Sequence, residues 1–197
     1  MEIVAQKSRT FLKKAWNDPD TVILAEDEAI LSTQTTVQKV WLPTNQFPKV
    51  ESTTQRKNKS IYGFLNLKTG KEHAIAFEHQ NMYNTTKALQ HIRRIYPKND
   101  NKRNKIKGKQ ILLLWDNPGW HRGSKVTEYT KKDGKIDVIY FPAYAPEENP
   151  QEHVWKKAKE HVVGNKFIEN INAATKDFLT YLTTTNFPYK LLNFSSL

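Results

Sequence analysis

The chain has 197 residues, a net charge of +11 and no cysteine. The length suits one domain with a single core, and the lack of cysteine excludes disulfide bonds and cysteine-ligated zinc. The positive charge favours nucleic acid as a partner over charge kept for solubility alone, because a basic surface releases counterions from phosphates. With neither a membrane-length apolar run nor the apolar core of a signal peptide, we expect a soluble cytoplasmic protein without a membrane partner.

The first half of the chain predicts one helix, several strands and a second helix. Residues 1–19 have the pattern of a short amphipathic helix that ends at Asn17-Asp18-Pro19. Four strands are expected after it, over residues 21–28, 35–43, 59–70 (with a turn at 68–70) and 72–79. Residues 84–97 then predict a helix, with Asn84 as its N-cap.

The second half alternates strands and helices. Residues 98–109 are polar and basic and predict a loop, while residues 111–116 are fully apolar up to Asp116, as in a central strand. The pattern then predicts a helix from Gly123-Ser124 to near Gly134, a strand over 136–142, a loop, a helix from Asn149 to Val163 closed by Gly164, and a last helix over 171–184. This order indicates an α/β fold, a mixed sheet with helices on its faces. We divide the single domain into an N-terminal helix or linker (1–19), a core (20–165) and a C-terminal helical end (166–197).

Three acidic residues occupy positions from which distant parts of a chain can meet. Asp27 ends the first strand, Asp116 ends the apolar strand, and Glu152 lies in the first turn of the helix that begins at Asn149. A cluster of carboxylates repels itself unless it holds a cation, so a joint site implies Mg²⁺ or Mn²⁺. Each acid also has a structural alternative: a strand-end turn for Asp27, a turn at Asp116, and a helix cap for Glu152.

Four segments resemble the mariner superfamily of DDE transposases, especially its bacterial insertion-sequence branch. They are LAEDEAILSTQTTVQKVWLP, KSIYGFLNLKTG, LLLWDNPGWHRG and FPAYAPEENPQEHVWKKAK, in order over about residues 22–160. The spacing of 36 positions from Asp116 to Glu152 also suits that family. The sequence departs from it at Glu148, where leucine is usual before Asn-Pro. Glu26 and Glu28 flank Asp27, so a ligand misassigned by one position is an alternative, although strand alternation would turn both away from Asp27.

The resemblance implies a ribonuclease H-like fold and a metal-dependent DNA endonuclease that also joins strands. Asp27, Asp116 and Glu152 would hold two ions of Mg²⁺ or Mn²⁺, supported by Asn117 and Asn149. Transposon ends and target DNA would be the partners, with a TA target and a homodimer on paired ends, in the nucleoid of a prokaryote. Such proteins carry helix-turn-helix domains before the catalytic domain. This chain begins where they would end, so it is either a truncated piece or a second reading frame.

Several other residues are candidates for contacts with DNA or metal. His153 and His161 are eight positions apart, a spacing that disfavours zinc. His121 is expected near the metal site, on a phosphate or on a carboxylate that supports it, with a hydrogen-bonded surface histidine as the alternative. Trp155 is expected in the core, and Trp120 either there or stacked on a base. The full set predicted to contact DNA is Lys102, Arg103, Lys105, Lys107, His121, Arg122, Lys156 and Lys159. Two rival functions remain open, a non-catalytic DNA-binding fragment and a plain nuclease of the same fold.

Overall fold

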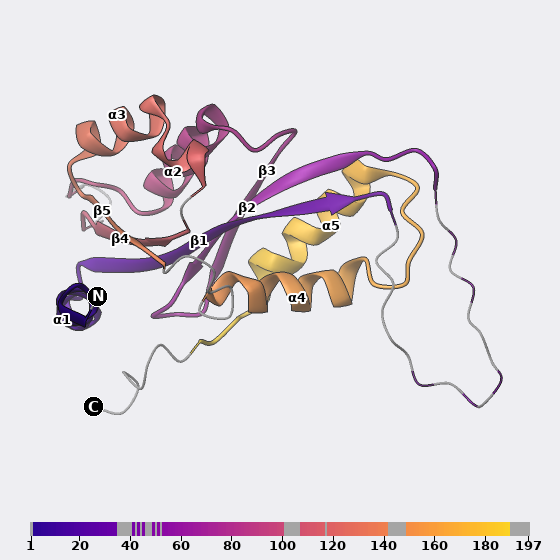
Figure 1. Ribbon diagram of the computed structural model, residues 1–197, viewed down its shortest axis with the longest axis horizontal. Helices are drawn as coiled ribbons and strands as arrows, with labels where there is room; N and C mark the ends of the chain where they lie inside the picture. The colour runs from indigo at the N-terminus through magenta and orange to yellow at the C-terminus, as the bar shows by residue number, and fades with distance from the viewer. Residues whose placement is uncertain are drawn as a thin grey trace.

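Five strands form one mixed sheet in the order β3-β2-β1-β4-β5 (Figure 1). They are β1 (Thr21–Ser32), β2 (Asn58–Asn66), β3 (Glu72–Phe77), β4 (Gln110–Trp115) and β5 (Ile136–Tyr140). The first three pair antiparallel, whereas β4 runs parallel to β1 and β5 runs parallel to β4. This computed structural model describes residues 2–34, 53–100, 107–116, 118–141 and 149–189, with side chains from Thr10 onward, and single residues between 41 and 51.

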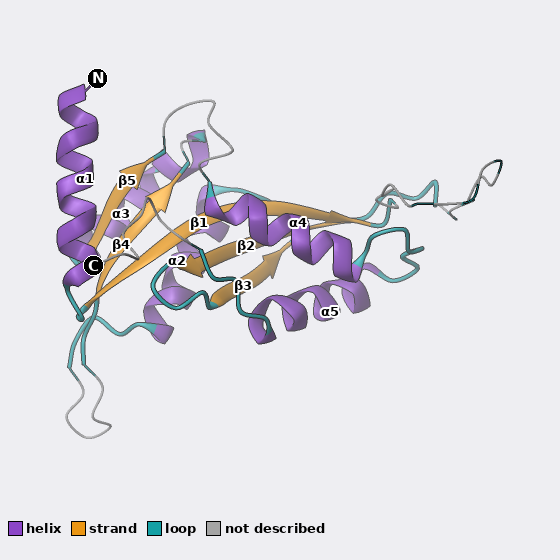
Figure 2. Cartoon of the chain, turned by 90° about the horizontal axis from the view of Figure 1, so that it is seen from below, coloured by secondary structure: helices purple, strands orange, loops and turns teal. Residues whose placement is uncertain are grey.

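The helices lie on both faces of the sheet. They are α1 (Glu2–Asn17), α2 (Met82–Ile95), the short 3-10 helix η1 (Gly119–Arg122), α3 (Ser124–Asp133), α4 (Pro150–Val162) and α5 (Ile171–Thr184). Figure 2 shows α4 and α5 together on one face, with α2 and α3 on the other. The predicted α/β class is therefore correct. Within the described part of the chain, no helix has the length and apolar character needed to cross a bilayer.

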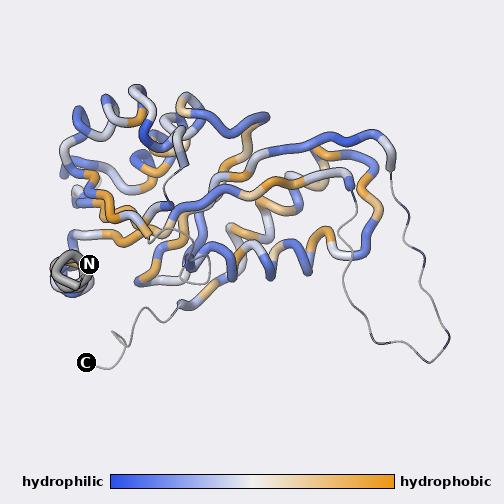
Figure 3. Tube along the Cα trace, viewed as in Figure 1, coloured by the Kyte–Doolittle hydropathy of each residue, from blue (hydrophilic) through white to orange (hydrophobic). Residues whose placement is uncertain are grey.

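The two faces of the sheet bury two separate apolar cores. Alternate residues of β1 supply both: Ile23 and Ala25 pack with α4 and α5, whereas Val22 and Leu24 pack with α2 and α3. A strand covered on both sides has no reason to alternate polar with apolar residues, which explains the continuous apolar runs of β1 and β4. Figure 3 shows these strands as the most hydrophobic part of the trace, with hydrophilic residues on the outer helices.

A buried ion pair joins α2 to the end of α3. The guanidinium of Arg93 donates to both carboxylate oxygens of Asp133, at 2.9 and 2.7 Å, and also to three backbone carbonyl oxygens. These bonds satisfy the charge of both side chains away from water, as a buried pair requires.

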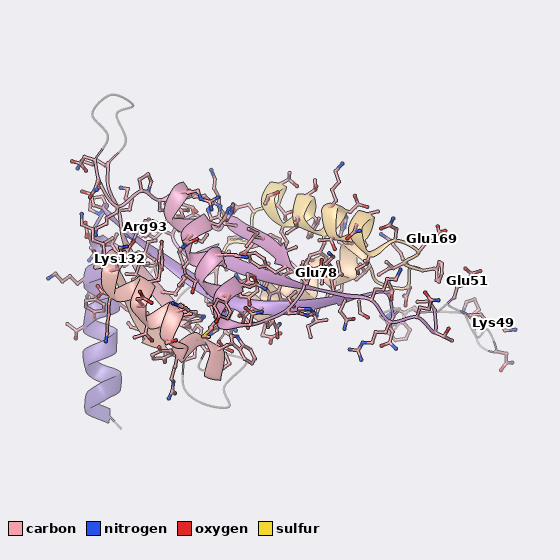
Figure 4. The ribbon with its side chains drawn as sticks, turned by 90° about the horizontal axis from the view of Figure 1, so that it is seen from above. Lys49, Glu51, Glu78, Arg93, Lys132 and Glu169 are labelled. Carbon is pink, nitrogen blue, oxygen red and sulfur yellow. The ribbon has the colours of Figure 1, made fainter. Side chains whose placement is uncertain are left out.

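Arg93 and Lys132 lie at one end of the molecule, and Lys49, Glu51 and Glu169 lie at the other (Figure 4).

Two details of the sequence prediction differ from the structure, and a third is not tested. Asn81, not Asn84, caps α2, because its Oδ1 accepts from the backbone N–H groups of Tyr83 and Asn84. Helix α4 ends at a cap on Val163, and the positive φ that follows belongs to Asn165 at 55°, not to Gly164. The strand predicted over 35–43 falls mainly outside the described residues.

Candidate active site

The parallel pairing of β1 with β4 brings two of the three predicted carboxylates together. Glu26 and Trp115 are register partners at the end of this pairing, so Asp27 and Asp116 follow at the same level on neighbouring strands. Carboxylate oxygens of Asp27, Glu28 and Asp116 all lie within 4.8 Å of one another. Asp116 follows the end of β4, as the sequence predicted. The prediction that Asp27 ends the first strand is wrong, because antiparallel pairing with β2 extends β1 to Ser32. Asp27 instead lies one residue beyond the last pair of β1 with β4, and Glu28 is an addition to the group.

Hydrogen bonds from β1 and α4 fix the carboxylate of Asp27. Its Oδ1 accepts from the backbone N–H of Glu28 at 2.8 Å. Its Oδ2 accepts from Nδ2 of Asn149 at 3.1 Å and from Nε1 of Trp155 at 3.2 Å. Burial, with the nearby charges of Asp116 and Glu28, raises the pKa of Asp27 to about 7, although these hydrogen bonds oppose the shift. A carboxylate that is buried and oriented in this way favours a cation beside it.

His121 lies beneath the carboxylates, not on the surface. Its side chain is buried, with Nδ1 3.0 Å from Oδ1 of Asp116 and Nε2 2.9 Å from Oε1 of Glu28. Burial alone would lower its pKa, but the two carboxylates raise the pKa of His121 to about 9. Trp115 stacks on the ring, with centroids 4.1 Å apart. Of the two predicted roles, contact with a carboxylate is therefore the one its position allows.

Glu26 and Glu28 both lie beside His121, whereas Asp27 contacts Asn149 and Trp155. Strand alternation predicted that both glutamates turn away from Asp27, but this is wrong for Glu28, whose carboxylate lies within 4.8 Å of that of Asp27. Glu26 is fully buried, 3.7 Å from Nε2 of His121. Burial, together with the charge of Glu28, holds the pKa of Glu26 well above its usual range. Glu28 accepts at its Oε1 from Nε1 of Trp120 at 3.1 Å, as well as facing His121. Trp120 thus contacts the site while 36% of it remains exposed.

Glu152 lies in the first turn of α4 and is exposed. The cap of α4 is the side chain of Asn149, whose Oδ1 accepts from the backbone N–H of Gln151 at 3.0 Å. Among the described residues, the carboxylate of Glu152 has no hydrogen-bond or ion-pair partner. Glu152 is also absent from the group of carboxylates whose oxygens lie within 4.8 Å of one another. That group consists of Asp27, Asp116 and Glu28. The capping-box alternative for Glu152 therefore finds no contact to support it.

A buried polar contact docks the first turn of α4 on the sheet. Nε2 of Gln151 donates to the backbone oxygen of Ala25 at 3.2 Å and to Oε1 and Oε2 of Glu72 at 3.1 and 3.3 Å. Both Gln151 and Glu72 are almost completely buried. An unpaired buried polar group is costly, so these bonds restrict how α4 can lie on β1 and β3.

Glu72 is expected to make the folded protein less stable as the pH rises. Burial raises its pKa to about 8, against hydrogen bonds from Gln151 and the backbone of Phe64 and a usual value of 4.5. Between these values the folded state holds a proton that the unfolded state releases, so stability falls with rising pH, by at most about 1.4 kcal/mol per unit. Urea unfolding of Glu72→Gln without metal should show a weaker decline than the wild type.

The control for this measurement is Glu160→Gln, which removes an exposed carboxylate from α4, the helix that carries the Glu72 partner Gln151. It should retain the wild-type decline between about pH 5 and about pH 8. An identical decline in Glu72→Gln and in the wild type would contradict the assignment.

The described C-terminal end of the basic loop, residues 107–109, adjoins the end of β4 remote from the carboxylates. It precedes Gln110, whereas Asp116 follows Trp115, and six residues of strand span about 20 Å. Lys107 and Lys109 instead pair with Asp20 at 3.1 and 3.0 Å, beside the start of β1. Lys102, Arg103 and Lys105, like Asn117 beside Asp116, fall outside the described residues.

Three other predicted DNA contacts are nearer the site. Lys156 is exposed on α4 and Lys159 half-buried there, one and two turns beyond Glu152. Arg122 ends η1, with its guanidinium 6.0 Å from the ring of Tyr140. These cations therefore lie on the two elements, η1 and α4, that also supply His121, Asn149 and Trp155 to the carboxylates.

The structure adds functional residues that the sequence prediction missed. Glu28 was considered only as a possible misassignment, and the Gln151–Glu72 contact was not foreseen. Trp155 was expected in the core, where it does lie, but its contact with Asp27 was not foreseen. The only local signal for Glu28 was its place beside Asp27. The partners of Gln151 and Trp155 are distant in sequence and give no local signal.

The donor set fits a hard divalent cation. Asp27, Glu28 and Asp116 offer only carboxylate oxygens, which Mg²⁺ and Mn²⁺ prefer. His121 is the only cationic side chain among their described partners. Its single positive charge is smaller than the summed charge of the ionised carboxylates, which leaves room for a metal ion.

Comparison with known proteins identifies the class. Residues 22–174, more than three quarters of the chain, match the family described as DDE superfamily endonuclease, and the chain belongs to that family. One similar sequence is an uncharacterized protein of Sinorhizobium fredii, y4pE/y4sA, 30% identical over 63 residues, which are 32% of this chain and 44% of that protein.

The fold is similar to that of the Mos1 mariner transposase. The Mos1 paired-end complex with the left transposon end superposes with a TM-score of 0.65 and 13% identity, covering 90% of this chain and 53% of that one. The Mos1 paired-end complex with Mg²⁺ gives 0.65 and 13%, covering 93% and 52%. The isolated Mos1 catalytic domain gives 0.60 and 12%, covering 90% and 78%. This likeness confirms the predicted ribonuclease H-like fold. The chain spans about half the length of the Mos1 transposase in the complexes.

Proposed function

We propose that this chain is a DNA transposase catalytic domain that cleaves phosphodiesters at transposon ends and joins the 3′-hydroxyl to target DNA. The observation that carries the proposal is the convergence of Asp27 and Asp116 just beyond the parallel pairing of β1 with β4, in a member of a DDE endonuclease family. The N-terminus of α4, which carries Glu152, docks on the same Asp27 through Asn149.

In this proposal Asp27, Asp116 and Glu152 hold two ions of Mg²⁺ or Mn²⁺. When bound, the ions activate a water or a 3′-hydroxyl and stabilise the leaving oxygen of the phosphodiester. Solved Mos1 complexes with Mn²⁺ and with Mg²⁺ support this choice of metals. Glu28, which lies within the carboxylate group, is an additional candidate ligand.

The side chains around the site orient the carboxylates. Asn149 and Trp155 hold Oδ2 of Asp27, and His121 holds Oδ1 of Asp116. The N-terminus of α4 favours the ionised form of Glu152, because the helix dipole is positive there. Pre-oriented ligands lose little freedom when the metal and the scissile phosphate arrive, which favours reaction over mere binding.

DNA is the proposed partner, and paired transposon ends held by a homodimer are the proposed assembly. The Mos1 structures described as paired-end and strand-transfer complexes support a DNA partner. We place the reaction on chromosomal DNA in a prokaryotic cytoplasm. The net charge of +11 suits this polyanionic substrate.

Contacts with phosphates near the site are expected from Lys156 and Lys159. Affinity falls as salt rises, and replacing both with glutamine should make the slope of log affinity against log salt less steep by roughly 0.9 per lost contact. The double substitution should also slow cleavage at saturating DNA. Neutralising Lys102, Arg103, Lys105 and Lys107 should also make the slope less steep. It should not slow cleavage, because this loop precedes Gln110, at the end of β4 remote from Asp116. Filter binding and single-turnover cleavage measure the two effects.

The matched control replaces Lys131 and Lys132, two exposed residues in the last turn of α3, with glutamine. It removes the same charge away from the carboxylates, so the single-turnover rate should be unchanged. Equal slowing in this control and in the α4 variant would contradict the proposed contacts.

Metal dependence and product analysis test the function directly. The chain, incubated with transposon-end DNA, should cleave in Mg²⁺ or Mn²⁺ but not in EDTA. Ca²⁺ should support binding without cleavage, because its looser geometry misplaces the attacking oxygen. Joined strands among the products indicate a transposase, whereas cleavage without joining indicates a plain nuclease of the same fold. Binding without any cleavage would identify a non-catalytic fragment, and full cleavage in EDTA would exclude the metal site.

A further inference from the structure

We propose that Gly63 of β2 is a positioning residue for the candidate active site: it leaves the space through which Trp155 reaches Asp27. Gly63 lies directly opposite Asp27 in the sheet, because the two are register partners in the antiparallel pairing of β1 with β2. The inference rests on the proposed function, since it concerns how Asp27 is oriented toward metal.

The backbone at position 63 does not itself require glycine. Positive φ angles among the described glycines occur at Gly70 and Gly134, and Gly63 lies within a regular strand. Glycine inside a strand loosens it and often marks a close approach by another group. The reason for glycine here is therefore the space above it.

The indole of Trp155 fills that space. A Cβ on residue 63 would lie 2.4 Å from Cη2 and 2.8 Å from Cζ2 of Trp155, and 2.7 Å from Oε1 of Glu72. These separations are shorter than van der Waals contact, so an added methyl group must displace a neighbour. The indole is rigid and Phe178 of α5 stacks on it, with centroids 6.4 Å apart, so it cannot simply rotate away.

Displacing Trp155 would release Asp27. Nε1 of Trp155 supplies one of the two hydrogen bonds that α4 makes to Oδ2 of Asp27, the other coming from Asn149. The added Cβ would also push on Oε1 of Glu72, which accepts a hydrogen bond from Gln151. Gly63 thereby couples the strand that bears Asp27 to the helix that bears Glu152.

Gly63→Ala should weaken the metal site more than the fold. Mg²⁺ requires near-ideal octahedral geometry, so a misplaced carboxylate should cost more in Mg²⁺ than in Mn²⁺. We expect the cleavage rate in Mg²⁺ to fall about tenfold to a hundredfold, with a smaller loss in Mn²⁺. The rise in Tm caused by Mn²⁺ should also shrink, which is measured without any DNA or activity.

Two further variants separate positioning from folding. Trp155→Phe keeps a ring over Gly63 but removes the N–H, so it should reproduce the Mg²⁺-to-Mn²⁺ difference without the steric clash. Ile111→Val removes buried volume from β4, in the core on the opposite face of the sheet from Trp155. It should lower the Tm but leave the Mg²⁺-to-Mn²⁺ ratio and the metal-induced rise in Tm unchanged.

The results distinguish this inference from the proposed function. If the wild type binds Mn²⁺ but cuts no DNA, the proposed function fails, and the metal-induced rise in Tm still tests Gly63. If Trp155→Phe retains the wild-type rise in Tm and the wild-type Mg²⁺-to-Mn²⁺ ratio, the inference is wrong. The same ratio change in Ile111→Val as in Gly63→Ala would also overturn it, because loss of packing alone would then explain the effect.

Discussion

Asp116→Asn is expected to remove DNA cleavage in Mg²⁺ while leaving the fold intact. The substitution keeps the size of the side chain but takes away a negative charge from the carboxylates that converge with Asp27. Lewis-acid assistance by a metal contributes several kcal/mol of transition-state stabilisation, so the single-turnover rate should fall about a thousandfold or more. Cleavage of end-labelled DNA measures the rate, and circular dichroism measures the fold.

The control is Asp137→Asn on the neighbouring parallel strand β5. Asp137 is exposed and accepts from Gln110 at 2.8 Å, at the end of the sheet remote from Asp116. Its variant should cleave at the wild-type rate. Retention of cleavage by Asp116→Asn to within about tenfold would mean that this carboxylate does not hold a catalytic metal.

Glu152→Gln is the second substitution with a large expected effect. As a ligand, Glu152 must be charged, so the variant should lose strand cleavage and the metal-induced rise in Tm. Its Tm without metal should stay the same or rise slightly, because repulsion among the carboxylates is relieved. A role limited to capping α4 predicts near-normal activity, since the loss of a cap costs about 0.5–2 kcal/mol and glutamine should lose less.

Glu147→Gln and Glu148→Gln are the matched controls for Glu152. Both lie just before α4 in the sequence, and neither should affect cleavage or stabilisation by metal. If Glu152→Gln cleaves at a near wild-type rate in Mg²⁺ while Glu148→Gln does not, the third carboxylate is Glu148. If Glu28→Gln alone abolishes the metal-induced rise in Tm, the third ligand is Glu28, the residue found within 4.8 Å of Asp27 and Asp116.

The elements of this fold were largely predictable because their signals are local. Helix α5 has the predicted bounds, 171–184, and α4 begins after the predicted cap at Asn149. The apolar run before Asp116 correctly indicated a central strand, since a strand buried on both faces needs no polar residues. Where local signals compete, the prediction was less accurate: both Asn81 and Asn84 can cap a helix, and only the observed turn selects Asn81.

By itself, the sequence determined that Asp116 follows an apolar strand and that Glu152 lies in the first turn of a helix. It did not determine that β1 continues past Asp27 to Ser32, because that depends on pairing with β2. Only the tertiary structure decided what surrounds these acidic residues. It placed His121 beneath the carboxylates, Trp155 over Gly63, and Lys107 and Lys109 at the opposite end of β4. The physical reason is that hydrophobic periodicity depends on neighbours a few residues apart, whereas these contacts depend on strand order and register, which join positions as distant as Asp27 and Trp155.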